Sequence, residues 1–331
     1  MKKIRVQDAV GKELFHDLTA IQADGKKGVQ FPRGHIIREE DIPTLLNMGK
    51  DNIFVAEEDE NYVHEEDAAE TVLDLCYDSS LEKRGPAEGK FTLHSRHNGL
   101  FIVNREGLLA INRTPDYTFA SIKHASPVKS GDMVVGARIV PLTTKQETVN
   151  LARSKAQLFR PIFKVLPYIN KPTGYIITGN EIYFGRKEDA FESILDNKLA
   201  TYGADKLDCI LCPDDIDAIC NAVKVLKEKN CEVILMTGGM SVDPDDLTPT
   251  AIKKMSDCFL FQGLPIQPGN MLTAAYSGNS ILIGVPGASM HAKVTALDIL
   301  LSRVYSEYPI SKDDFIEMGE GGLSVCKTWP L

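Results

Sequence analysis

The chain has 331 residues, of which 43% are hydrophobic and 25% are charged. This composition is typical of a globular protein of roughly two domains, and it excludes a disordered or collagen-like chain. The 37 Lys and Arg residues against 46 Asp and Glu give a formal net charge of −9, which argues against binding to nucleic acid or to an anionic membrane surface.

The first residues are basic, but polar side chains interrupt them before any apolar run develops, so we expect no signal peptide. No apolar stretch approaches the roughly 18 residues of a membrane span. The seven cysteines are odd in number and stand mostly in apolar contexts, which predicts reduced thiols and a cytoplasmic protein. Cys209 and Cys212 have Cys-x-x-Cys spacing but lie in an apolar strand, so we expect core thiols rather than a zinc site.

The front half of the chain predicts two modules. Residues 1–64 combine strand-like runs with one short helix and predict a small α/β module. Residues 65–165 alternate short apolar runs with turn signals and predict a β-rich module with flanking helices, the last over residues 146–159. Prolines at 161, 167 and 172 mark a linker, where we place the main domain boundary.

The rear half has a different pattern, in which nearly all-apolar strands alternate with amphipathic helices. The predicted strands are Tyr175–Thr178, Leu207–Cys212, Val233–Thr237 and Ile281–Val285. This alternation predicts an α/β domain over residues 170–310, with a mostly parallel sheet covered by helices on both faces. Residues 311–331 form a C-terminal tail.

Each predicted strand of this domain ends in a polar segment, and most of these segments contain glycine. The segments are Thr178-Gly179-Asn180-Glu181, Cys212-Pro213-Asp214-Asp215, the run from Thr237 to Pro249, and Val285-Pro286-Gly287-Ala288-Ser289. In an open α/β sheet, ligands bind beyond the carboxyl ends of the strands. We therefore expect these four segments to form one binding site.

The third segment carries the strongest signal for a ligand. Gly238 and Gly239 allow the backbone to approach a ligand closely, and Thr237 and Ser241 add hydroxyl groups. We expect Thr248 to cap the next helix, whose first residues then offer N–H groups to an anion.

Three acidic residues of the same segment, Asp243, Asp245 and Asp246, would repel a bare phosphate. A phosphate ligand therefore implies a divalent cation between them. A tight turn with capping aspartates is the plainer alternative, but the length of the motif and the three other strand ends favour a binding site.

The Thr-Gly-Gly-x-Ser-x-x-x-x-Asp-x-Thr run at 237–248 resembles the central motif of the molybdopterin-binding domain shared by molybdopterin adenylyltransferases and molybdopterin molybdenumtransferases. Pro213-Asp214-Asp215, Thr178–Glu181, Gln267-Pro268-Gly269-Asn270 and Val285-Pro286-Gly287 resemble the other motifs of that family, in the same order. More loosely, residues 32–49 resemble a segment that molybdenumtransferases carry just before this domain. The resemblance implies a three-layer αβα domain, most like that of a molybdenumtransferase with a rearranged, β-rich N-terminal half.

The resemblance also implies roles for individual residues. Asp214 and Asp246 would be catalytic and coordinate Mg²⁺, and Glu181 would order the ligands around the metal or the site water. The amides of Gly238, Gly239 and Gly287 would hold phosphates. The full set of implied ligand-binding residues is Thr178, Gly179, Thr237, Gly238, Gly239, Ser241, Thr248, Pro268, Gly269, Pro286, Gly287 and Ser289.

The activity implied by the resemblance is insertion of molybdate into adenylated molybdopterin with release of AMP. Adenylylation of molybdopterin with ATP is an alternative that Pro244 favours, because adenylyltransferases often have proline there. A non-catalytic binder or escort of the cofactor is another, favoured by Pro-Gly-Ala-Ser at 286–289 and by Asn270 in place of a lysine. A nucleotide pyrophosphatase is a remoter alternative. The implied partners are pterin and nucleotide ligands, a client molybdoenzyme and a second copy of the chain in a homodimer.

Overall fold

The computed structural model describes residues 1–21, 27–57, 61–241, 243–244 and 246–328. Asp245 of the third segment lies outside these residues. The chain divides into two compact units. The first is made of Met1–Arg96, Ile102–His124 and Ser130–Lys164. The second is made of His97–Phe101, Ala125–Lys129 and Val165–Leu331. The described part of the chain contains no helix with the length and apolar character needed to cross a bilayer.

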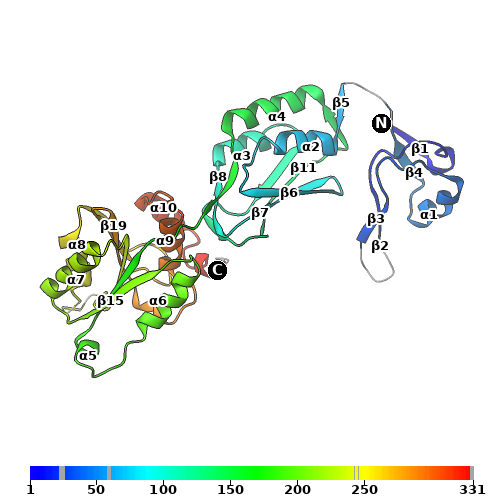
Figure 1. Ribbon diagram of the computed structural model, residues 1–331. Helices are drawn as coiled ribbons and strands as arrows, with labels where there is room; N and C mark the ends of the chain where they lie inside the picture. The colour runs from blue at the N-terminus through cyan, green and yellow to red at the C-terminus, as the bar shows by residue number, and fades with distance from the viewer. Residues whose placement is uncertain (22–26, 58–60, 242, 245, 329–331) are drawn as a thin grey trace. The chain divides into compact units, whose positions relative to one another are not determined.

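The first unit is rich in short antiparallel strands (Figure 1). Its strands are β1 (Lys2–Arg5), β2 (Leu18–Ile21), β3 (Lys27–Phe31), β4 (Asn52–Val55), β5 (Tyr62–His64), β6 (Leu81–Ala87), β7 (Lys90–Ser95), β9 (Tyr117–Ser121), β11 (Met133–Ile139) and β12 (Thr143–Lys145). Its helices are α1 (Ile42–Asn47), α2 (Glu65–Leu73), α3 (Arg105–Asn112) and α4 (Gln146–Phe159). The largest sheet has the order β6-β7-β11-β9, and α4 has the bounds that the sequence predicts.

A separate three-stranded sheet has the order β10-β8-β13, with β8 (Gly99–Val103), β10 (Ser126–Val128) and β13 (Phe163–Pro167). Beside these sheets, the first residues of the chain build a small core of their own around Val6, Leu14 and Leu45, all fully buried. Its strands pair as β1–β4 and β2–β3.

The second unit is built on a six-stranded sheet in the order β15-β14-β16-β19-β18-β17. The strands are β14 (Thr173–Thr178), β15 (Lys206–Cys212), β16 (Val233–Thr237), β17 (Cys258–Gln262), β18 (Thr273–Ser277) and β19 (Ser280–Gly284). The helices are α5 (Asn180–Tyr183), α6 (Phe191–Ala200), α7 (Ile216–Glu228), α8 (Thr248–Met255), α9 (Ala296–Tyr305), α10 (Lys312–Ile316) and α11 (Val325–Thr328). The first four strands in this order are parallel, and β17 and β18 add an antiparallel edge.

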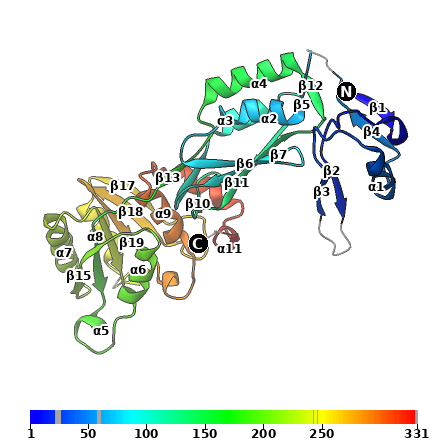
Figure 2. The ribbon, with the colours of Figure 1, turned by 45° about the vertical axis from the view of Figure 1, so that its right-hand side comes forward.

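Helices cover both faces of this sheet, with α7 and α8 on one side and α6 and α9 on the other (Figure 2). Successive side chains of a strand point to opposite faces of the sheet. Leu235 therefore packs in the core under α6 and α9, and its neighbour Ile234 packs in the core under α7 and α8. Burial of each such side chain contributes about 2 kcal/mol to folding. The three-layer αβα architecture expected from the apolar strands is therefore present, with strand ends within two residues of those predicted.

The C-terminal segment packs back on the second unit. Phe315 is fully buried in the core under α9, and Met318 is nearly so. The N–H of Gln267 donates to the carbonyl of Gly322 at 2.9 Å, and a Cβ added to Gly322 would lie 2.1 Å from the carbonyl oxygen of Pro265. The segment thus supports the loop that leads from β17 to β18.

Candidate functional site

The carboxyl ends of β14, β15, β16 and β19, with the loops that follow them, lie level at one edge of the sheet, called the rim below. Thr178 is in register with Cys212, Ile177 with Thr237, and Met236 with Gly284. Since β18 runs antiparallel to β19, with Thr273 opposite Gly284, the loop before β18 reaches the same edge. All of the predicted site segments therefore belong to the rim.

The strand order also marks a crevice within the rim. The chain leaves β14 to form β15 on one side and then crosses to form β16 on the other. Open α/β sheets bind ligands at such a switch point, between the two strand ends where the connections diverge. Here these ends carry Thr178-Gly179 and Thr237-Gly238-Gly239.

Gly238 and Gly239 shape the β16 end through conformations that favour glycine, with φ values of +83° and +51°. A Cβ on Gly238 would lie 2.1 Å from the carbonyl oxygen of Thr178, closer than any side chain tolerates. The two strand ends are therefore in direct backbone contact, and their amide groups lie close to any ligand in the crevice.

Thr248 does not cap α8, contrary to the expectation from the sequence. Leu247 is the N-cap residue, and its side chain makes no capping bond. Thr248 is instead the first residue of the helix, and its hydroxyl donates to the carbonyl of Gly238 at 2.8 Å, with the Thr178 hydroxyl 3.5 Å away. Because Thr248 is fully buried next to that carbonyl, its hydroxyl bonds within the protein.

Thr237 holds an unusual position at the end of β16. The residue is fully buried, and its Oγ1 has no hydrogen-bond partner among the described residues. Leaving a buried hydroxyl unpaired costs about 1–3 kcal/mol. A polar ligand at the rim would offset that cost.

The two consecutive aspartates after β15 bond to different elements. Asp214 Oδ2 accepts the N–H of Asn180 at 2.9 Å, and the N–H of Asp214 donates to Asn180 Oδ1 at 3.4 Å. Asp215 instead caps α7 by accepting the N–H of Ala218 at 2.8 Å. Asn180 thus links the β14 and β15 ends, a role that its place between Gly179 and Glu181 did not reveal.

The remaining acidic groups of the site are exposed or half-buried. Asp246 Oδ2 accepts the N–H of Asp243 at 2.9 Å, which closes the turn before α8. Glu181 is exposed, and its Oε2 would lie 3.2 Å from a Cβ added to Gly179, whose φ is +144°. Ser241 is also exposed.

The two Pro-Gly loops differ from each other. Gly269 is buried and has a φ of +102°. A Cβ added to Gly269 would lie 3.0 Å from the backbone nitrogen of Ala296. The N–H of Ala296 donates to the carbonyl of Pro268 at 3.0 Å. Gly287 is exposed, with open space around its Cα. The first loop therefore packs on the start of α9, whereas Gly287 of the second loop is exposed.

A buried ion pair that the sequence did not predict supports the second loop. Lys198 Nζ lies 2.7 and 2.9 Å from the two carboxylate oxygens of Asp298, and it also donates to the carbonyl of Lys293 at 3.1 Å. Asp298 Oδ2 accepts the N–H of Thr295 at 2.7 Å, and the Thr295 hydroxyl lies 3.2 Å from that of Ser289. The Thr-x-x-Asp spacing of a capping box was the available signal for this cap, but nothing in the sequence pointed to Lys198.

Direct contacts bring some of the predicted residues together in three groups along the rim. The first group is Thr178, Gly238, Gly239 and Thr248. The second is Asp214 with Asn180, and the third is Pro268, Gly269 and Ser289 with the start of α9. Four other predicted residues lie on rim loops: Asp246, Glu181, Ser241 and Gly287. Among the described residues, none of these four has a hydrogen bond to a predicted residue of another segment.

The described residues include no group of three or more His, Cys, Asp or Glu side chains arranged to hold a metal ion. Cys209 packs against the core on one face of the sheet and Cys212 lies in the core of the other face, so the two thiols cannot share an ion. Burial raises the pKa of Cys209 to about 12 and that of Cys212 to about 11. Both therefore remain protonated at neutral pH.

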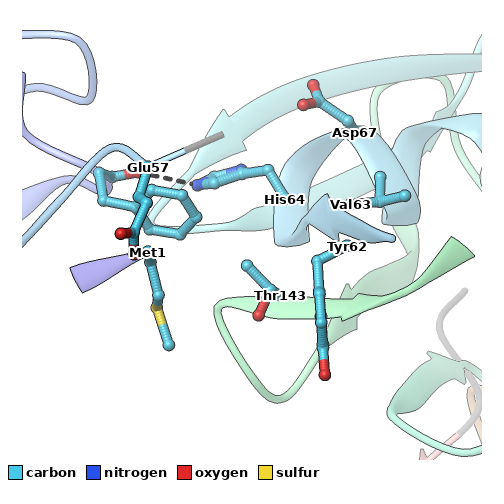
Figure 3. Close-up of a pocket in the computed structure, with 8 residues that line it drawn as sticks. Met1, Glu57, Tyr62, Val63, His64, Asp67 and Thr143 are labelled. Carbon is cyan, nitrogen blue, oxygen red and sulfur yellow. Dashed lines mark hydrogen bonds between the residues drawn. The ribbon is translucent and has the colours of Figure 1, made fainter. Parts of the chain in front are cut away.

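Two cavities lie apart from the rim. One of about 260 Å³ lies beside Lys171 and Glu232, at the amino ends of β14 and β16. A larger one of about 850 Å³ belongs to the first unit, where Glu57, Tyr62, His64 and Asp67 surround an open space (Figure 3).

His64 forms one wall of the larger cavity and uses both ring nitrogens. Nδ1 accepts the N–H of Glu66 at 3.2 Å, so Nε2 carries the proton and donates to the carbonyl of Phe15 at 3.0 Å (Figure 3). Burial and the positive charge of Arg33 lower the pKa of His64. Arg33 itself bonds Glu66 and Asp67, both at 3.0 Å.

Two family models match the chain. Residues 3–57 match "Domain of unknown function (DUF8806)", and residues 174–305 match "Probable molybdopterin binding domain". The second match covers β14 to α9 and so contains every predicted site residue.

Curated relatives match over parts of their length. A CinA-like protein of Amoebophilus asiaticus is 31% identical over 86 residues, which are 26% of this chain and 21% of the relative. A molybdopterin molybdenumtransferase of Bacillus subtilis is 28% identical over 130 residues, which are 37% of this chain and 30% of the relative. The chain thus spans a fifth to a third of the length of these relatives.

Among solved structures, the MoaB molybdopterin biosynthesis enzyme of Thermus thermophilus has 17% identity and a TM-score of 0.35, over 40% of this chain and 89% of that one. CinA of Thermoplasma acidophilum has 19% identity and a TM-score of 0.33, over 42% and 99%. Residues 174–305 of the present chain therefore match the family described as a probable molybdopterin binding domain, over less than half of the chain.

Proposed function

We propose that the protein acts in molybdenum cofactor biosynthesis, where it binds adenylated molybdopterin at the rim and inserts molybdate with release of AMP. The observation that carries the proposal is the level register of four parallel strand ends with Gly238 and Gly239 at the switch point between β14 and β16. Main-chain N–H groups in such a turn bind phosphate without a nearby lysine. The unpaired hydroxyl of Thr237 supports the same location.

The carboxylates of Asp214 and Asp246 fit a role as Mg²⁺ ligands. Each accepts one backbone N–H through Oδ2, and a carboxylate has about four lone-pair sites, so both retain capacity for a cation. Mg²⁺ is commonly held by one or two carboxylates, with phosphate and water as the other ligands. When bound there, the ion would neutralise the charge of the pyrophosphate.

The chain's own residues would then act by positioning. The amides of Gly238, Gly239 and Gly287 would orient the phosphates, and the Thr237 and Ser241 hydroxyls would fix the adjoining part of the ligand. Glu181 would order the attacking water as the phosphoanhydride bond is cleaved and AMP leaves. Catalysis of this kind rests on preorganised dipoles and needs no nucleophilic side chain.

Adenylylation of molybdopterin with ATP is the second candidate, because Pro244 takes the position that adenylyltransferases often give to proline. Incubation with molybdopterin, ATP, Mg²⁺ and molybdate separates the candidates. Release of AMP on molybdate addition to the adenylated substrate supports insertion, and release of pyrophosphate from ATP supports adenylylation. Tight pterin binding with neither product would show an escort protein and overturn both catalytic proposals.

Replacement of Asp246 by Asn tests the proposed metal ligand. We expect turnover to fall at least about 100-fold, since a lost charge-stabilising group typically costs that much. The melting temperature should change little because Asn Oδ1 can still accept the Asp243 N–H. A large loss of stability with activity intact would contradict the role.

The quaternary and cellular setting is part of the proposal. We infer a cytoplasmic homodimer in which the front modules complete the partner's site and which serves a client molybdoenzyme. Light scattering of the full chain measures the oligomeric state, and a monomer that retains full activity would overturn the shared site.

A further inference from the structure

Helix α5 ends in two adjacent aromatic side chains that face solvent. Tyr183 is the last residue of the helix and is 49% exposed, and Phe184 follows it and is 61% exposed. The two rings stand edge to face, with centroids 5.2 Å apart and planes at 80°. Large aromatic side chains exposed side by side are typical of surfaces that bind a partner or a ring system.

This pair, called the aromatic platform below, is attached directly to the rim. Helix α5 begins at Asn180, whose N–H donates to Asp214. A helix rises by about 1.5 Å per residue, so the platform lies about one turn from the carboxylate that is the candidate metal ligand. In Figure 1 and Figure 2, α5 lies at the lower end of the second unit.

Positive charge accompanies the exposed rings. The guanidinium carbon of Arg186 lies 5.5 Å from the centroid of the Phe184 ring, within the range of a cation–π contact. The N–H groups of Arg186 and Lys187 both donate to the carbonyl of Glu181, at 2.8 and 3.0 Å, which folds this turn back onto α5. The platform therefore combines exposed ring faces with the guanidinium of Arg186, next to the edge that we propose binds phosphate.

We propose that Phe184 stacks on the fused heteroaromatic ring of the ligand whose phosphates occupy the rim, with Tyr183, whose plane is nearly perpendicular, against the edge of that ring and Arg186 beside its phosphate. The inference rests on the proposed function, because it assumes a phosphorylated ligand at Gly238 and Gly239. Stacking on an aromatic side chain tolerates different ring systems, since each presents a π-face. Adenine and pterin share this chemistry, and the experiment distinguishes them.

The test measures binding of three probes to the full chain in the presence of Mg²⁺: AMP, neopterin monophosphate and inorganic pyrophosphate. For Phe184→Ala we expect affinity for at least one ring-bearing probe to fall about tenfold, with pyrophosphate affinity unchanged. The probe that responds identifies the ring that stacks. Phe184→Trp should restore the affinity and show a fluorescence change on binding that ring but not on binding pyrophosphate.

Phe259→Ala is a matched control, because Phe259 is also an exposed phenylalanine with a cation, Lys253 Nζ, 5.8 Å from its ring centroid. It lies in β17 opposite Ala275, away from the rim, and its replacement should leave all three affinities unchanged. Equal affinities of the parent and Phe184→Ala for both ring-bearing probes would overturn the platform alone. A parallel loss of pyrophosphate binding would also overturn it, since that loss reports a damaged rim. Failure of the parent chain to bind any of the probes would overturn the proposed function and the platform with it.

Discussion

The rim of the second unit and the cavity of the first unit both gather polar groups, but they use them differently. At the rim, the Thr237 hydroxyl has no partner among the described residues, and Asp214 and Asp246 keep capacity for a cation. At the cavity, His64 bonds through both ring nitrogens, and Arg33 bonds the cavity residue Asp67 and also Glu66. The rim thus contains a buried hydroxyl without a partner among the described residues, whereas His64, Arg33, Glu66 and Asp67 bond to neighbouring protein groups.

The largest effect that would test this contrast is expected from Gly238→Ala. The added Cβ meets the backbone carbonyl of Thr178 at 2.1 Å in a residue with φ +83°, so the two strand ends must separate. We expect the free energy of unfolding to fall by about 4 kcal/mol, measured by urea denaturation. Gly136→Ala, where a Cβ meets no atom within 4 Å, is the control and should cost less than about 1 kcal/mol. Equal effects of the two replacements would show that the rim is not rigidly held.

Breaking the buried pair below the second loop should have the next largest effect. Lys198 and Asp298 are 9% and 4% exposed, so Lys198→Met leaves an uncompensated carboxylate in the interior. We expect a loss of about 3 kcal/mol in the free energy of unfolding. Adding Asp298→Asn should recover much of that loss, because the unpaired charge is then gone while Thr295 keeps an acceptor. Failure of the double replacement to recover stability would assign the effect to lost packing instead.

A smaller effect is expected from pH at the cavity wall. Because the folded state lowers the pKa of His64 below its ordinary value of 6.5, the unfolded chain binds the proton first. The contribution of neutral His64 to stability is therefore complete above about pH 6.5 and is lost progressively as the pH falls below it. His64→Asn should reduce this pH dependence in thermal unfolding between pH 7 and pH 5. His16, whose pKa burial also lowers, has the same sign and would account for the dependence that remains.

The smallest effect is expected from Arg33→Ala. Arg33 is 36% exposed, and its ion pairs with Glu66 and Asp67 are partly screened by water, so the loss should be about 0.5 kcal/mol. Since Arg33 contributes to the lowered pKa of His64, its removal should also weaken the pH dependence. An unchanged pH profile in this variant would show that burial alone sets the titration of His64.

The sequence predicted the second unit well where burial dictates the pattern. Strands such as β16 are buried at every position, and the period of α7 matches its buried face, so both were evident from apolar spacing. The antiparallel edge was not predicted, because β17 is largely exposed and carries no clear alternation. Pairing with β18 is a tertiary choice that local residues do not specify.

For the candidate site, glycine and strand-end positions could be predicted but side-chain partners could not. The Thr-Gly-Gly run correctly indicated an unusual backbone, since few residues other than glycine adopt positive φ. The partner of the Thr248 hydroxyl could not be predicted, because it depends on which carbonyl the fold brings near. That carbonyl belongs to Gly238, ten residues earlier in the chain. Lys198 and Asp298 are 100 residues apart, and only the packing of α6 against the start of α9 unites them.

The bond between Gln267 and Gly322 has a practical consequence for expressing the second unit in isolation. A fragment trimmed to the family match at 174–305 would lack Phe315, Met318 and the carbonyl that holds Gln267. Such a fragment would expose apolar surface to aggregation and loosen the loop that begins at Pro265. A protease acting on the C-terminus would have the same result, so residues 306–328 belong to the folded unit even though the family match stops at residue 305.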